Sequence, residues 1–484
     1  MTHTAWLDAL SRQLGPQGLW RPGVEADAAQ LQPHEVDWRG RYHGRALALA
    51  RPANVAEVVA VVQACAAHGV SIVPQGGNTS LVGGSVPDGS GQQLVLNLQR
   101  LNQVISVDAA NLSMVVQSGC LLSQVQAAAQ AQGLLFPLSL ASEGSCTIGG
   151  NLASNAGGTQ VLRYGTARAL CLGLQVVTPQ GQVLDGLSAL RKDNTGYDLR
   201  DLYIGSEGTL GIITAASLRL HPQPRGVATA LLACEDLSQA VALLQMAHHH
   251  LDAGLTAFEV MAHGPLALVQ QHQAQAAAAL SPLLDPRGTP PEWAVLIENT
   301  SCESDAHAQE RLQLLLTQAM TLNLTQGVVV ATQAHQRQQM WQLRESIPQA
   351  EKREGLMVKH DIGMPTSEIP RFVNEVGQAL QARWPQSQVV CFGHLGDGNL
   401  HYNVQPPADA RQGLALEDFE RAVNTLVFDA VERRRGTLSA EHGIGQLRRE
   451  ELAQRASPVA LQMMQAIKKA IDPAGLMNPG RVLR

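Results

Sequence analysis

The stretch Pro74-Gln-Gly-Gly-Asn-Thr-Ser-Leu-Val-Gly-Gly-Ser85 decides the fold of the first half of this chain. It follows Ser71-Ile72-Val73, a short β-branched segment that predicts a strand. Its four glycines let backbone N–H groups turn toward an anion and approach it closely. The stretch matches neither the P-loop pattern nor the G-x-G-x-x-G pattern of nicotinamide-binding folds. It therefore favours a phosphate-binding loop of another kind, with a plain glycine turn as the alternative.

Two further stretches have the same character. Residues 137–158 contain SEGSCTIGGNLASNAGG, and residues 205–213 read GSEGTLGII. Three loops rich in glycine and amides within one domain suit a long cofactor that carries a pyrophosphate and a flat ring. Such a cofactor would be bound through backbone N–H groups and not through Lys or Arg.

Composition narrows the class of protein. Hydrophobic residues make up 45% and charged residues 16% of the 484 residues, and 44 residues are glycine. This balance excludes a disordered chain, a coiled coil and a small disulfide scaffold. The net charge is −6 and no basic tract occurs, which argues against nucleic-acid binding.

The cysteines and the apolar segments indicate the cellular compartment in which the protein resides. Seven cysteines are scattered singly without a C-x-x-C pair, which argues against an iron–sulfur cluster, a zinc ribbon or a thioredoxin site. The odd number fits a reducing cytoplasm. The N-terminus lacks the order of a secretory signal, and polar residues interrupt the longest apolar stretch, around residues 53–73. We therefore expect a cytoplasmic protein without a membrane span.

The pattern of segments predicts an α+β protein. Asn54–Gly69, Ser238–His250 and Ser304–Met320 have helical patterns, whereas Leu94–Leu98, Ser113–Gln117, Gly173–Thr178, Trp293–Glu298 and Val328–Ala331 have strand patterns. Composition shifts after Leu220-His-Pro-Gln-Pro224. We expect a helical lead-in at 1–44, the glycine-rich domain at 45–224, a second α+β domain at 225–430, and a segment at 431–484 that completes the sites.

A histidine hairpin is predicted at Val389–Val404, which reads VVCFGHLGDGNLHYNV. Asp-Gly between β-patterned flanks indicates a two-residue turn at Asp397-Gly398. In that register His394 lies opposite His401, and Phe392 lies opposite Asn403. Opposed residues have Cβ atoms about 4.5–5.5 Å apart, so the two imidazoles could share one metal ion. A hydrogen-bonded pair of histidines in a partly buried hairpin is the alternative.

A third metal ligand is available in Ser439-Ala-Glu-His-Gly-Ile-Gly445. Glu441 would complete a set of two histidines and one carboxylate, which leaves coordination positions open, as in catalytic metal sites. His442 would then be a neighbouring base, because adjacent side chains rarely point to one centre.

These motifs resemble a known family. PQGGNTSLVGGSVP, SEGSCTIGGNLASNAGG, LRKDNTGYDL and IGSEGTLGIIT resemble the FAD-binding domain of the vanillyl-alcohol-oxidase flavoprotein superfamily, and GHLGDGNLH and SAEHGIG resemble its D-2-hydroxyacid dehydrogenase branch. The resemblance runs from about residue 40 to the C-terminus. It implies a two-part FAD-binding domain of the vanillyl-alcohol-oxidase (PCMH) type and an α+β substrate domain with an antiparallel sheet.

The resemblance also implies the FAD-binding residues. They are Pro74, Gln75, Gly76, Gly77, Asn78, Thr79, Ser80, Gly83 and Gly84 in the first loop, Ser145, Ile148, Gly149, Gly150, Ser154, Asn155 and Gly158 in the second, Glu207, Gly208, Gly211 and Ile212 in the third, and Asn478 near the end of the chain. Some relatives attach FAD through a histidine in the first loop. Asn78 stands at that position here, which implies noncovalent FAD.

For the reaction site, the resemblance implies Zn²⁺ on His394, His401 and Glu441, with His442 as the base and Asn403 at the substrate. It further implies that carboxylates bind to Arg344, in Trp341-Gln-Leu-Arg-Glu345, and to Lys359. The sequence departs from the hydroxyglutarate pattern at Pro348, where that group of enzymes has a threonine, so one hydroxyl contact to the distal carboxylate is lost.

The implied activity is oxidation of a D-2-hydroxy acid, foremost D-2-hydroxyglutarate, to the 2-oxo acid, with the hydride passing to flavin N5. D-lactate and glycolate are the alternative substrates. A noncatalytic flavoprotein subunit of a larger oxidase is the alternative from another class. The resemblance implies a separate electron acceptor, such as an electron-transfer flavoprotein or a quinone, and relatives are often homodimers.

Overall fold

The computed structural model describes residues 4–484, which form two compact units. The first unit comprises the described residues up to Gly158 together with residues 165–223 and 441–484. The second comprises residues 159–164 and 224–440. Each unit is described by itself below.

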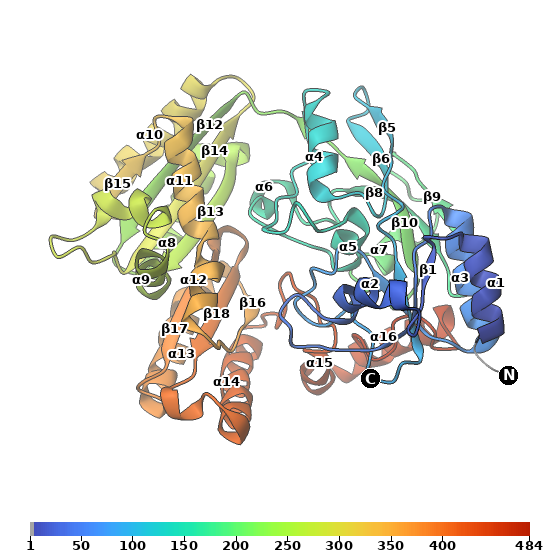
Figure 1. The fold of residues 1–484 in the computed structure, drawn as a ribbon. Helices are drawn as coiled ribbons and strands as arrows, with labels where there is room; N and C mark the ends of the chain where they lie inside the picture. The colour runs from blue at the N-terminus through green and yellow to red at the C-terminus, as the bar shows by residue number, and fades with distance from the viewer. Residues whose placement is uncertain (1–3) are drawn as a thin grey trace. The chain divides into compact units, whose positions relative to one another are not determined.

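The first unit contains two main sheets and the helices that flank them (Figure 1). Its strands are β1 (Leu19–Trp20), β2 (Ala46–Ala50), β3 (Ile72–Gln75), β4 (Gln93–Asn97), β5 (Val104–Asp108), β6 (Ser113–Gln117), β7 (Leu134–Leu135), β8 (Cys171–Val177), β9 (Val183–Gly186), β10 (Ile212–Arg219) and β11 (His221–Pro222). Its helices are α1 (Thr4–Leu14), α2 (Glu25–Glu35), α3 (Val55–His68), α4 (Leu122–Gln130), α5 (Ile148–Ala153), α7 (Arg200–Tyr203), α15 (Arg449–Arg455) and α16 (Pro458–Ile471).

Strand β3 ends where the first glycine loop begins. The small sheet has the order β1-β2-β4-β3, in which β4 pairs in parallel with both β2 and β3. Helix α3 connects β2 to β3; the side chain of Asn54 caps its first turn, and Gly69 ends it in the left-handed conformation with φ 64°. Val58, Val61, Val62 and Cys65 bury one face of α3 against the sheet. This packing fixes the point at which the chain leaves β3.

The larger sheet of the first unit carries the other two glycine loops. Its order is β5-β6-β10-β8-β9, and its neighbouring strands are antiparallel. The third loop runs directly into β10, the central strand, which is buried from Ile212 to Leu218. The second loop contains the short helix α5.

The second unit is built on one seven-stranded sheet. Its strands are β12 (Gly226–Cys234), β13 (Leu255–Ala262), β14 (Trp293–Ser301), β15 (Gly327–Val330), β16 (Asp361–Gly363), β17 (Gln388–His394) and β18 (Asn399–Gln405). Its helices are α6 (Val161–Tyr164), α8 (Leu237–Leu251), α9 (His263–His272), α10 (Asp305–Thr321), α11 (Ala334–Glu345), α12 (Ile347–Glu354), α13 (Ile369–Arg383) and α14 (Gly413–Arg433). The sheet order is β15-β12-β14-β13-β17-β18-β16, with antiparallel neighbours.

Both faces of this sheet are covered by helices (Figure 1). Successive residues of a strand point to opposite faces, and β13 shows the pattern: Phe258 and Val260 pack with α8, α10, α13 and α14, whereas Met261 packs with α9 and α11. Glu259 points to the same face as Met261 and is nevertheless buried. A carboxylate in this position requires partners.

The predicted α+β class and the antiparallel sheet of the second domain are confirmed. All seven cysteines are free, and six of them are buried. None of the helices formed by residues 4–484 is long and apolar enough to cross a membrane.

Candidate functional site

The first unit brings the three glycine loops together. The backbone N–H of Gly205 donates to Leu152, and that of Glu207 donates to Ala153, so the third loop is bonded to the end of α5 in the second loop. A Cβ atom on Gly77 would lie 1.9 Å from the carbonyl oxygen of Ser145. The first and second loops therefore touch backbone to backbone, which only glycine permits at this position.

Asn478 joins the first and third loops from the far end of the sequence. Its Nδ2 donates to the carbonyl oxygens of Gly84 at 3.0 Å and Glu207 at 2.7 Å, and its backbone N–H donates to Ile72. The remaining amide oxygen, Oδ1, is buried and has no hydrogen-bond partner within the described chain. A buried acceptor in this state fits a donor group of a bound cofactor.

The other residues expected at FAD lie on the same three loops. Pro74 and Gln75 end β3; Gly76, Thr79, Ser80 and Gly83 follow in the first loop; Ile148, Gly149 and Gly150 form the first turn of α5, and Ser154, Asn155 and Gly158 follow it; Gly208 and Gly211 precede Ile212 at the start of β10. The side chain of Asn78 is fixed by two hydrogen bonds, in which Nδ2 donates to the carbonyl oxygens of Pro33 and Val36.

Glu207 uses its carboxylate within the chain. Oε1 accepts the N–H of Ile444 and Oε2 accepts the N–H of Gly445, both at 2.7 Å. Burial raises the pKa of this carboxyl, although both hydrogen bonds oppose the shift. The side chain of Glu207 thus fixes the segment that follows His442. Because the carboxylate is used in this way, the backbone of the third loop would make any contact to the adenosine side of FAD.

The predicted register of the histidine hairpin is wrong. His394 pairs with Asn399, and His401 pairs with Phe392. A two-residue type I′ turn needs positive φ at both central residues, but only Gly398 has it, with φ 81°, because residues 395–397 form a 3₁₀ turn. The connection therefore has four residues, 395–398, and the opposed pairing of Phe392 with Asn403 fails for the same reason.

The two histidines nevertheless share one face of the sheet. The register differs from the predicted one by two residues, and side chains alternate with a period of two. His394 and His401 become diagonal neighbours, with ring centroids 5.7 Å apart. The error in the turn thus leaves the predicted proximity intact.

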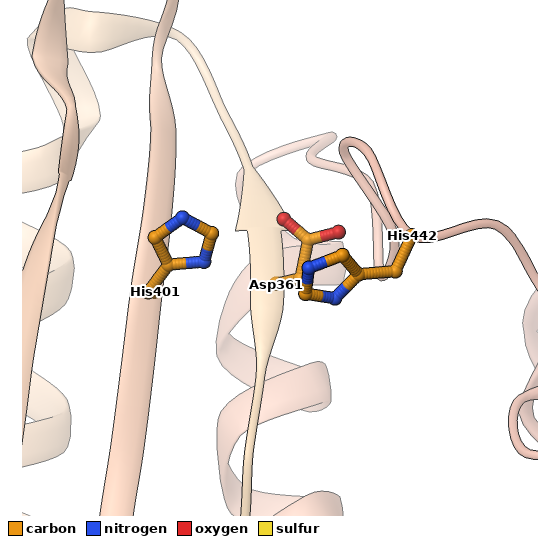
Figure 2. A group of neighbouring side chains, drawn as sticks. All are labelled: Asp361, His401 and His442. Atoms are coloured by element: carbon orange, nitrogen blue, oxygen red, sulfur yellow. The ribbon is translucent and has the colours of Figure 1, made fainter. Parts of the chain in front are cut away.

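Ligand atoms of two three-residue groups lie within 4.8 Å of one another: His394, His401 and Glu441, and Asp361, His401 and His442. Figure 2 shows the second group, with Asp361 and His401 on strands and His442 on a loop. Asp361 is paired with His401 in the register of β16 and β18. Glu441 and His442 follow Ala440, whose N–H donates to the carbonyl oxygen of Asp361. Imidazole and carboxylate groups so arranged suit Zn²⁺.

A buried carboxylate holds His394. Nδ1 of His394 lies 2.6 Å from Oε1 of Glu259, and Nε of Arg344 donates to Oε2 at 2.8 Å. Burial alone would raise the pKa of Glu259, but His394 and Arg344 outweigh burial and lower it. The guanidinium of Arg344 also lies over the ring of Phe392, 4.7 Å from its centroid.

A second buried carboxylate joins two other predicted residues. Glu351, on α12, accepts from Nζ of Lys359 at 2.8 Å and from Nδ2 of Asn403 at 2.6 Å. Oδ1 of Asn403 accepts the N–H of His360. Asn403 can therefore offer a substrate only its second amide N–H and a remaining lone pair.

Sequence reasoning missed Asp361, Glu259 and Glu351. Asp361 lies two residues after Lys359, at the start of a strand. A carboxylate so close to an expected substrate-binding residue could have indicated a further site residue. Glu259 interrupts the apolar segment Ala257–Ala262, and such an interruption is the signal of a buried, paired charge. Glu351 has no signal of this kind, because it belongs to the charged helix segment Gln349–Glu354.

Comparison with known proteins shows the family to which this chain belongs. Residues 46–186 match the family described as "FAD binding domain", and residues 223–482 match the family described as "FAD linked oxidases, C-terminal domain". The chain is 38% identical to mitochondrial D-2-hydroxyglutarate dehydrogenase of Rattus norvegicus, over 96% of this chain and 83% of that protein. It belongs to the FAD-dependent D-2-hydroxyacid dehydrogenases. A member of this family is an oxidoreductase that acts on CH–OH donors.

A bacterial relative and a solved structure extend the comparison. The D-2-hydroxyglutarate dehydrogenase of Xanthomonas citri pv. viticola is 38% identical over 95% of this chain and 94% of its own length. The fold matches that of p-cresol methylhydroxylase with a TM-score of 0.73 and 17% identity, over 99% of this chain and 96% of that one. The predicted PCMH-type fold is thus confirmed.

Proposed function

We propose that this enzyme oxidises D-2-hydroxyglutarate to 2-oxoglutarate, with FAD in the first unit and a Zn²⁺ site at His394, His401 and Glu441. The observation that carries the proposal is the 38% identity to the rat enzyme over 96% of the chain. The site residues support it, because a dicarboxylate substrate calls for two cationic groups, and Arg344 and Lys359 are both held in place by hydrogen bonds.

The reaction removes a hydride from C2 and a proton from the hydroxyl. FAD supplies a hydride acceptor, and a divalent metal supplies a Lewis acid that makes the hydroxyl more acidic. His442 takes the hydroxyl proton at a ring nitrogen as general base. Arg344 binds one carboxylate through its terminal amino groups, since its Nε is already bonded to Glu259.

The second carboxylate falls to Lys359. Its ammonium lies 2.8 Å from Oε2 of Glu351. The side chain is 32% exposed, so a substrate carboxylate can approach the positive charge. Asn403 supports this arrangement by holding the other oxygen of Glu351.

One observation favours a shorter substrate, D-lactate or glycolate. Pro348 lies in the first turn of α12, where it offers neither a hydroxyl nor a backbone N–H. Glu351 on the same helix already neutralises Lys359. Pro348 therefore gives a distal carboxylate one hydrogen bond fewer than a threonine would, and the pairing with Glu351 reduces the positive charge that Lys359 can offer.

The reduced flavin needs a separate acceptor, and we propose an electron-transfer flavoprotein or a quinone. We place the enzyme in the cytoplasm, since all seven cysteines are free thiols.

A substrate panel with an artificial dye acceptor tests the proposal. D-2-hydroxyglutarate, its L-enantiomer, D-lactate and glycolate are compared by kcat/KM. We expect D-2-hydroxyglutarate to be the best substrate, by at least about tenfold, which corresponds to about 1.4 kcal/mol of transition-state stabilisation. A preference for D-lactate or glycolate would contradict the proposed substrate, and turnover of none of them would contradict the proposed activity.

A further inference from the structure

We propose that Glu259 is a positioning residue that couples the metal ligand His394 to the substrate-binding residue Arg344. The inference rests on the proposed function. It concerns a residue outside both histidine-containing motifs, more than a hundred positions before His394 in the sequence.

The carboxylate of Glu259 serves both partners at once. Glu259 lies on β13, directly opposite His394 on β17. Oε1 is 2.6 Å from Nδ1 of His394, and Oε2 is 2.8 Å from Nε of Arg344. The carboxylate is 1% exposed, so water does not compete for either contact. One rigid group therefore fixes two side chains from different elements.

For His394 the contact fixes the tautomer. A carboxylate accepts hydrogen bonds, so Nδ1 carries the proton that it donates to Oε1. The lone pair of the ring is then on Nε2, the nitrogen that would bind a metal ion. A ligand histidine held in this way binds metal more tightly, because its ring orientation and basicity are both set.

For Arg344 the contact fixes the plane of the guanidinium. Nε is bonded to Oε2, and the ring of Phe392 lies against the guanidinium. The terminal amino groups make no other hydrogen bond that the described residues provide. A guanidinium held at Nε keeps its fork for a carboxylate and loses little freedom on binding it.

Glu298, on the neighbouring strand β14, provides a matched control. It is also buried, but it accepts from Nε1 of Trp341 and Oγ1 of Thr229 and contacts none of the proposed ligands. Both donors bond to Oε2, so a glutamine amide can keep them. Replacing Glu298 therefore removes a buried carboxylate from the same sheet without breaking the coupling.

The experiment compares Glu259→Gln, Glu259→Asp and Glu298→Gln in the full-length flavoprotein. Each protein is stripped of metal with a chelator and titrated calorimetrically with Zn²⁺ alone. We expect Glu259→Gln to weaken Zn²⁺ binding by about 10–100-fold and to raise the KM for D-2-hydroxyglutarate, with the FAD content unchanged. Glu259→Asp, which keeps the charge, should recover part of both losses, and Glu298→Gln should match the wild type.

Arg344→Gln keeps the test decisive if Glu259→Gln does not fold. Arg344 is no metal ligand, yet coupling through Glu259 predicts that its removal changes Zn²⁺ affinity more than about twofold, the size typical of residues in contact. Wild-type Zn²⁺ affinity in Glu259→Gln, or in Arg344→Gln where Glu259→Gln does not fold, would overturn the coupling, as would equal losses in Glu298→Gln. A wild-type protein that neither binds Zn²⁺ nor oxidises the hydroxy acid would instead contradict the proposed function itself.

Discussion

At the scale of single residues, the proposed FAD site depends on a glycine whose missing Cβ lets two loops touch. Gly77 has no Cβ, and a Cβ there would lie 1.9 Å from the backbone oxygen of Ser145. We predict that Gly77→Ala forces the first and second loops apart, costs about 1–3 kcal/mol of stability and lowers the FAD retained after gel filtration. Gly144→Ala, in the same second loop but with open space around it, is the control. Equal FAD content in the two variants would contradict the close packing.

The histidine pair carries a separate prediction. We expect His401→Ala to lower kcat by more than about a hundredfold, since a Lewis acid supplies several kcal/mol of stabilisation, while FAD stays bound on the other unit. Activity and flavin absorbance are measured on the same sample. His249→Ala, on the exposed part of α8, should behave like the wild type. Loss of FAD together with activity would argue against separate sites.

At the scale of elements, local sequence signals predict the ends of a helix well but predict the register of a hairpin less well. The predicted helix Asn54–Gly69 matches α3, because Asn54 and Gly69 each cap their own end of the helix. The Asp-Gly signal at residues 397–398 predicted a hairpin correctly but gave the wrong register. The register follows from the 3₁₀ turn that Leu395–Asp397 form, and the Asp-Gly pair does not encode that turn.

Strand β14 carries a prediction about pH. Burial raises the pKa of Glu298 from its usual 4.5, so the folded protein binds this proton more tightly than the unfolded chain does. The resulting stability is fully present below pH 4.5 and is lost as the pH rises through the raised pKa. Glu298→Gln should remove this loss, up to about 1.4 kcal/mol per pH unit. Urea unfolding of the wild type and of Glu298→Gln at a series of pH values from 4.5 upward measures this loss. A free energy of unfolding that changes with pH in the same way in both proteins would contradict the raised pKa.

At the scale of the whole molecule, the sequence predicted that the glycine loops lie together and that His394 lies near His401, but not which residues hold them. The glycine loops and the His394 and His401 motif are contiguous in sequence, so their chemistry can be recognised there. Glu259 contacts His394, 135 positions away, and Glu351 contacts Asn403, 52 positions away. A local pattern can mark Glu259 as a buried charge, but it cannot name the distant partner, because the partner depends on which strands become neighbours in the sheet.

The glycine loops and the hairpin histidines belong to different units, and this predicts the effect of metal removal. The three loops proposed to bind FAD belong to the first unit, and His394 and His401 belong to the second. We expect a chelator to abolish turnover and leave the flavin spectrum unchanged, and Zn²⁺ to restore turnover. Full activity after exhaustive metal removal, verified by elemental analysis, would contradict the metal site.

The most direct measurement is anaerobic reduction of the bound flavin without any added acceptor. D-2-hydroxyglutarate should bleach the visible flavin band of the purified protein and yield one 2-oxoglutarate per FAD, because hydride transfer needs only the substrate, the flavin and the site residues. L-2-hydroxyglutarate should leave the band unchanged. A band that stays oxidised with the D-enantiomer, while dithionite still bleaches it, would contradict the proposed reaction.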